Sequence, residues 1–85
     1  TASEAQVILR QSDVAAAKAQ VAQREAELDA ARRRFSRSQT LSSEGAASMQ
    51  ELDDDRARMR GAEAALAATQ AQVAAGEAAV AAARA

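Results

Sequence analysis

Large apolar side chains recur every seven residues in two stretches of this chain. The first stretch holds Val7, Val14, Val21, Leu28 and Phe35, and the second holds Leu52, Met59, Leu66, Val73 and Val80. A sustained period of seven keeps one stripe of an α-helix against a partner helix in a left-handed supercoil. We therefore expect two long helices that bury these ten residues as the core of a coiled coil.

Small residues occupy most core positions between the large ones. They are Ala17 and Ala31 in the first stretch, and Ala62, Thr69, Gly76 and Ala83 in the second. Side chains this short let two helices approach closely. The predicted seam is therefore narrow.

The two stripes mirror each other in number. Each large residue has a counterpart that brings the two numbers to 87, from Phe35 with Leu52 out to Val7 with Val80. Opposite charges follow the same rule, which predicts the ion pairs Arg10–Glu77, Arg24–Glu63 and Arg34–Asp53. This symmetry favours an antiparallel hairpin folded at its midpoint, with a register that interdigitation of the layers can shift by a residue or so.

The residues at the midpoint are typical of a turn between helices. Ser42-Ser43-Glu44-Gly45 interrupts the helical pattern, and Gly45 suits the left-handed position just past a helix end. Ser48 followed by Glu51 is a capping box. We predict an all-α fold, an antiparallel two-helix coiled-coil hairpin with helices at roughly 4–43 and 48–84 and a short turn at 44–47.

Composition narrows the possibilities further. Of 85 residues, 27 are Ala and only 14 are large and apolar, which is too few for a layered core, and Phe35 is the only aromatic residue. Cys and His are absent, which removes most nucleophilic, metal and acid–base chemistry. We expect no enzymatic activity, no metal and no cofactor. The net charge of −1 gives no overall attraction to nucleic acid.

Charged clusters flank the midpoint. Arg32, Arg33, Arg34 and Arg37 precede it, and Asp53, Asp54 and Asp55 follow it. A nucleic-acid patch is disfavoured because no aromatic residue interleaves with the arginines. A metal site is disfavoured because consecutive helical carboxylates diverge by about 100°. We interpret the clusters as complements of the helix dipoles that pair across the hairpin.

Leu41 is not explained by the core, because it lies six residues after Phe35 and off the stripe. Arg37 precedes it by one helical turn, and Ser48 lies across the turn. Each has an ordinary structural explanation: Arg37 complements the dipole, Leu41 closes the helix end, and Ser48 is a cap. The explanation is weakest for Leu41, because an exposed apolar residue at the end of a rod usually meets a partner.

These three residues form the pattern R-x3-L-x6-S within RFSRSQTLSSEGAASMQELDDDRA. The stretch resembles the tip motif of the α-hairpin in periplasmic adaptor proteins, the membrane fusion proteins or HlyD family of Gram-negative tripartite efflux and secretion systems. Within that family the chain resembles hairpins of adaptors that serve drug-efflux and ABC-type pumps. The sequence does not decide whether the transporter is of the ABC, RND or MFS type. The resemblance covers all 85 residues.

The resemblance implies a function by docking. The tip is expected to meet the periplasmic end of a TolC-like outer-membrane channel through Arg37, Leu41 and Ser48. Six sister adaptors are expected to form a ring, and domains absent from this chain (lipoyl-like, β-barrel and membrane-proximal) are expected to reach an inner-membrane transporter. The parent protein would be periplasmic and anchored to the inner membrane. Residues 1–85 would be one hairpin cut from that larger adaptor, binding weakly and monomeric when isolated.

A rival interpretation keeps the same fold. A coiled-coil spacer or scaffold arm with an unrelated protein partner would show the same heptads and the same symmetry. Only Arg37, Leu41 and Ser48 argue against it. The sequence does not reveal the transported substrate or the identity of the channel.

Overall fold

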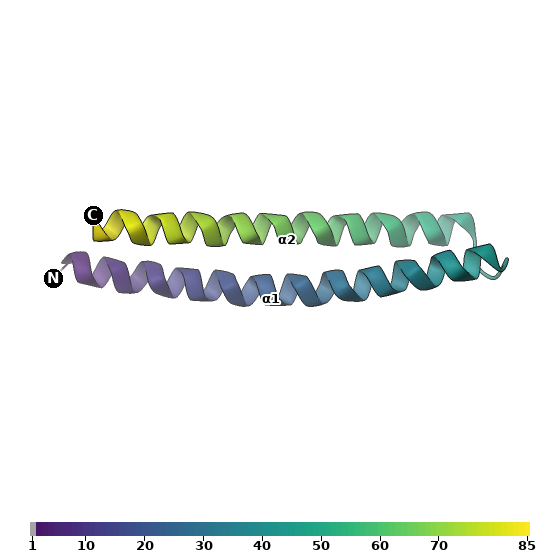
Figure 1. The fold of residues 1–85 in the computed structure, drawn as a ribbon, viewed down its shortest axis with the longest axis horizontal. Helices are drawn as coiled ribbons and strands as arrows, with labels where there is room; N and C mark the ends of the chain where they lie inside the picture. The colour runs from purple at the N-terminus through teal and green to yellow at the C-terminus, as the bar shows by residue number, and fades with distance from the viewer. Residues whose placement is uncertain (1) are drawn as a thin grey trace.

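The computed structural model describes residues 2–85 and consists of two long helices, α1 (Ala2–Ser43) and α2 (Met49–Arg84). They run antiparallel, and Figure 1 shows both ends of the chain at one end of the rod and the turn at the other. The rod measures 66 × 14 × 12 Å. No strand occurs within residues 2–85. The predicted all-α hairpin is confirmed, with α1 beginning two residues before the expected start.

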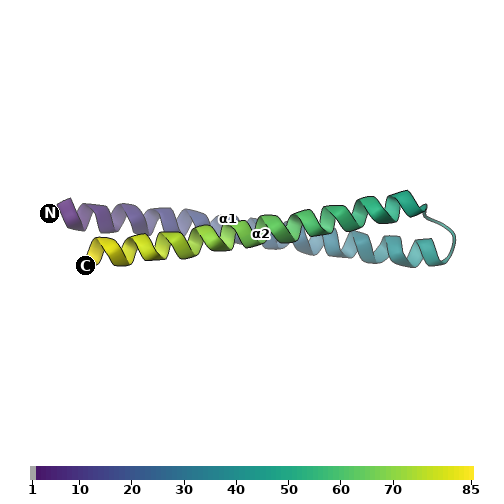
Figure 2. The same ribbon diagram turned by 90° about the horizontal axis from the view of Figure 1, so that it is seen from above.

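The helices wind around each other. Seen from above, α2 crosses in front of α1 at a shallow angle, in the sense of a left-handed supercoil (Figure 2). This is the supercoil that a seven-residue repeat imposes, because 3.5 residues per turn is slightly fewer than a straight helix has.

The heptad stripe faces the partner helix along the whole rod. Val14 and Leu28 are buried, and the other eight stripe residues are half-buried. Ala31, Ser38 and Thr69, three residues after stripe positions, are buried as well. A two-helix rod has no third layer to cover its seam, so most core residues keep some exposure.

The register differs from the expected one. A Cβ atom added at Gly76 would lie 2.9 Å from Cγ2 of Val14, so Val14 packs against the backbone of α2 beside Gly76. The mirrored numbering instead paired Val14 with Val73. The shift is three residues, almost one turn. It sets a large residue of one helix opposite a small residue of the other, which fills a narrow seam better than two large residues at one level.

This register also changes the ion pairs. Arg10 and Arg24 bind acids one turn ahead on α1, so the expected pairs of these arginines with Glu77 and Glu63 are wrong, and Arg34 pairs with Asp55 in place of Asp53. The pairs across the hairpin are Lys18–Glu77 at 3.9 Å, Arg32–Glu63 at 3.9 Å and Arg34–Asp55 at 3.4 Å.

Polar groups interrupt the apolar seam at two levels. Ser38 donates a hydrogen bond to the carboxylate of Asp55, which Arg34 also contacts. Thr69 donates to carbonyl oxygens of its own helix, those of Ala65 and Leu66. Within residues 2–85 no buried side-chain nitrogen or oxygen lacks a hydrogen-bond partner. The polar core residues therefore carry no desolvation penalty from an unmade bond.

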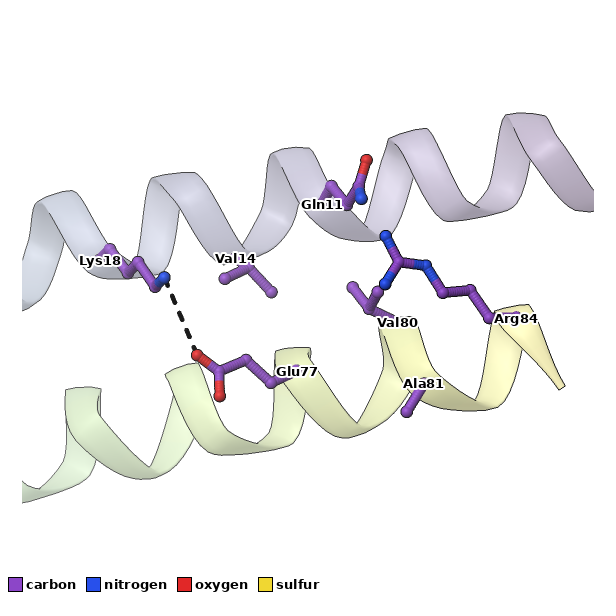
Figure 3. A pocket seen from close by; sticks show the side chains of 7 residues that line it. All are labelled: Gln11, Val14, Lys18, Glu77, Val80, Ala81 and Arg84. Atoms are coloured by element: carbon purple, nitrogen blue, oxygen red, sulfur yellow. Dashed lines mark ion pairs between the residues drawn. The ribbon is translucent and has the colours of Figure 1, made fainter.

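Two shallow grooves mark the two broad faces of the hairpin. The Lys18 face is the side where Lys18, Gln70 and Glu77 line the seam. Figure 3 shows Lys18 reaching from α1 across this groove to Glu77 on α2, beside Val14 and Val80. The Arg34 face is the opposite side, where Arg34, Arg58 and Gly61 line the groove.

Candidate partner-binding site at the hairpin tip

A specific turn ends α1. Gly45 has φ +77°, and its N–H donates to the carbonyl of Ser42 at 3.1 Å. The N–H of Ala46 donates to the carbonyl of Leu41 at 2.7 Å. These two bonds form a Schellman motif with Gly45 in the left-handed position, as the sequence predicts. The motif fixes the path of the chain at the tip and ties the backbone of Leu41 into it.

Ser48 begins α2 as its N-cap. Its backbone is extended, and its Oγ accepts a hydrogen bond from the N–H of Glu51 at 3.1 Å. The return bond of the expected capping box, in which the N–H of Ser48 would donate to the Glu51 carboxylate, is not formed within residues 2–85. A hydroxyl both donates and accepts, so the hydrogen of Ser48 is still able to donate to a partner. The residue is exposed.

Leu41 lies in the last turn of α1 with 43% of its surface exposed. It lines a shallow hollow on the outside of the helix together with Ser36, Arg37 and Thr40. Thr40 donates a hydrogen bond from its hydroxyl to the carbonyl of Ser36, at 3.2 Å. An apolar side chain this exposed gains stability only when another surface covers it.

Arg37 differs from the other three arginines of its cluster in forming no ion pair within residues 2–85. Arg32, Arg33 and Arg34 all form ion pairs, with Glu63, Asp29 and Asp55. Arg37 is exposed and has no ion pair or hydrogen bond within the described residues 2–85. The last turn of α1 holds no basic residue, so the expected dipole role is wrong: the dipole acts within a single turn of the helix end, and Arg37 lies before it.

The structure therefore brings two of the three predicted residues together. Arg37 and Leu41 share the hollow on α1, whereas Ser48 stands at the start of the other helix with no described contact to either. All three are exposed, and a turn with defined hydrogen bonds joins the two helices that they come from. They offer a charged donor, an apolar surface and a hydroxyl donor within one end of the rod.

Met49, the first residue of α2, is 66% exposed and was not among the residues predicted from the sequence. The signal was available, because Met49 is off both heptad stripes, as Leu41 is. Besides Leu41, the large apolar residues that are exposed within residues 2–85 are Ile8 at 67% and Leu9 at 55%, and both lie at the opposite end of the rod.

Within residues 2–85 no three His, Cys, Asp or Glu side chains gather as they would to hold a metal ion. Neither described helix has a stretch apolar enough to cross a membrane.

Residues 13–85 match the family described as RND MFP, alpha-helical hairpin domain, in which MFP stands for membrane fusion protein. The match includes the turn, the caps and all three predicted contact residues. No curated protein and no solved structure matches the chain significantly. The description specifies the RND class, which the sequence alone left open among three transporter types.

Proposed function

The chain belongs to the α-helical hairpin domain family of RND membrane fusion proteins, and from that premise we propose that its tip docks onto the periplasmic end of a TolC-like outer-membrane channel. The observation that carries the proposal is Leu41, a large apolar side chain held half in water by a turn that fixes its backbone. Folding gains nothing from that exposure, whereas a partner surface would.

Each of the three residues has a separate role in this proposal. Leu41 enters an apolar groove between channel helices. Arg37, with its five N–H donors unused within residues 2–85, binds backbone carbonyls or carboxylates at the rim of that groove. Ser48 donates its free hydroxyl hydrogen while its oxygen continues to cap α2.

The positions of the two chain ends are compatible with insertion of the hairpin in a larger adaptor. Both ends of the hairpin lie together, so a hairpin can be inserted in another domain without disturbing it (Figure 1). We place it between two halves of a lipoyl-like domain in a periplasmic protein that serves an inner-membrane RND transporter. The hairpin has a non-catalytic role. Six such hairpins side by side would bring six tips to the channel, and avidity would multiply weak contacts.

The test measures binding of the 85-residue chain to a purified TolC-like channel encoded in the same genome. The chain is coupled densely through its carboxyl end to a biosensor surface, which leaves the tip free and supplies avidity. Leu41→Asp is expected to abolish binding, with helicity and melting temperature nearly unchanged. Ile8→Asp is the matched control, because it makes the same chemical change at an exposed residue of the opposite end.

Three results would count against the proposal. Equal binding by Leu41→Asp and wild type would remove Leu41 from the interface. A large loss of thermal stability in Leu41→Asp would identify Leu41 as a core residue. Absence of binding by the wild type at this density would favour the rival role, a coiled-coil arm with a different partner.

A further inference from the structure

Met49 is the most exposed large apolar residue at the tip, with 66% of its surface open to water. It is the first residue of α2 and directly follows the N-cap Ser48. The hairpin does not need an apolar group there, because the cap bond is made by Ser48 and the seam begins at Leu52, which is half-buried. The other methionine, Met59, is on the stripe and half-buried.

The heptad assigns Met49 to one face of the hairpin. It lies seven residues before Arg56, and further steps of seven reach Glu63, Gln70 and Glu77. Gln70 and Glu77 line the groove of the Lys18 face, and Glu63 pairs with Arg32 across it. In a supercoil, residues seven apart keep the same side. Met49 therefore continues the Lys18 face to the tip.

Leu41 belongs to the opposite face. It follows Arg34 by seven residues, and Arg34 lines the groove on the Arg34 face with Arg58 and Gly61. Arg34 also borders a polar hollow nearer the tip, lined by Glu51, Asp54, Asp55 and Arg58. The two large apolar residues exposed at the tip thus emerge on opposite sides of one hairpin.

We propose that Met49 is a second apolar docking residue, so that the channel holds the tip from both faces, Leu41 on one and Met49 on the other. This inference rests on the proposed function and adds a residue to it. The occupant is the channel because Met49 directly follows Ser48 at the same end of the rod as Leu41, the end that the proposed function brings to the channel. The flexible thioether chain of Met adapts to such a surface at little cost.

Gripping from two faces has a mechanical consequence. A partner that touched only Leu41 would leave the tip free to pivot about a single contact, whereas contacts on both faces fix the orientation of the rod. The two contacts are independent, because they lie on different sides and the turn between them is fixed by its own hydrogen bonds. Their contributions to binding should therefore add.

The experiment is a double-mutant cycle on the same biosensor surface with the same TolC-like channel. The variants are Met49→Gln, Leu41→Gln and the double variant, with Ile8→Gln as control at an exposed residue of the other end. Gln keeps helix propensity and nearly the length of Met, so melting should not change. Met49→Gln is expected to weaken binding about tenfold, and the double variant to weaken it by about the product of the two single effects.

The outcomes separate this inference from the proposed function. If Leu41→Gln weakens binding and Met49→Gln matches Ile8→Gln, the channel contacts one face only and the inference is wrong. If the double variant loses no more than either single variant, the two residues share one contact, and the two-faced grip is wrong. If wild type itself does not bind, both the proposed function and this inference fail.

Discussion

The shaft and the tip of this hairpin place their large apolar residues by different rules. In the shaft every large residue except Ile8 and Leu9 falls on the seven-residue stripe and is at least half-buried. At the tip Leu41 and Met49 leave the stripe and are 43% and 66% exposed. The shaft uses its large apolar groups to join two helices, whereas Leu41 and Met49 are left exposed at the tip, where the proposed docking would cover them.

The largest effect on stability is expected from a charge placed in the core of the shaft. Leu28 is 5% exposed, and Leu28→Asp loses its packing and buries a carboxylate, at a cost of roughly 3–5 kcal/mol. That equals the whole ~3–5 kcal/mol that a core of this size supplies. We expect loss of the helical circular dichroism signal at 25 °C, whereas Leu41→Asp should melt like wild type. Retained helicity in Leu28→Asp would refute the heptad core.

The close approach of the helices gives a sharper test within the shaft. Gly61→Ala places a methyl group in open space and should stabilise α2 by about 0.8–1 kcal/mol through helix propensity. Gly76→Ala brings the same gain, but its Cβ would lie 2.9 Å from Val14 Cγ2, and overpacking costs about 1–3 kcal/mol. Thermal melts should therefore rank Gly61→Ala above wild type and Gly76→Ala below it. Equal stabilisation by both would contradict the register.

A substitution in the turn should lower stability less than one in the core, and it should weaken channel binding at the tip. Gly45 has φ +77°, and a β-branched residue there costs about 1–2 kcal/mol. Gly45→Val should lower the melting temperature moderately and weaken channel binding more than its stability loss explains, because the Schellman bonds also fix Leu41. Unchanged affinity would mean that the turn does not position the contact residues.

The smallest effect is expected from charge on the shaft surface. Lys18 and Glu77 are 3.9 Å apart with side chains 63% and 58% exposed, and such pairs are worth about 0–1 kcal/mol. Glu77→Gln should leave both melting and channel binding within error of wild type. A marked loss of binding would show that the Lys18 face of the shaft takes part in docking.

Much of the fold could be predicted because its determinants are local. The period of seven, Gly45 and the Ser48 cap each act within a few residues, and both helices end close to where the sequence indicates. The register could not be predicted from mirrored numbers, since Val14 packs against Gly76 and not at the level of Val73. Side chains meet by size across the seam, and a small residue opposite a large one fills it better.

The candidate site likewise has features that the sequence predicts and features that it does not. Leu41 was found because its position off the stripe is visible in the sequence, and its exposure agrees with that. The freedom of Arg37 was hidden, because it depends on which neighbours its sister arginines bind: Arg33 takes Asp29 on its own helix, and Arg34 takes Asp55 on the other. Met49 was not predicted, because its 66% exposure depends on the exact residue at which α2 begins after the cap at Ser48.

Site-specific crosslinking can decide whether the tip alone contacts the channel. A photo-crosslinking amino acid is placed in turn at positions 8, 41 and 49, and each variant is irradiated with the TolC-like channel. We expect crosslinks to the channel from positions 41 and 49, to different residues of it, and none from position 8. A crosslink from position 8, or none from position 41, would contradict this expectation.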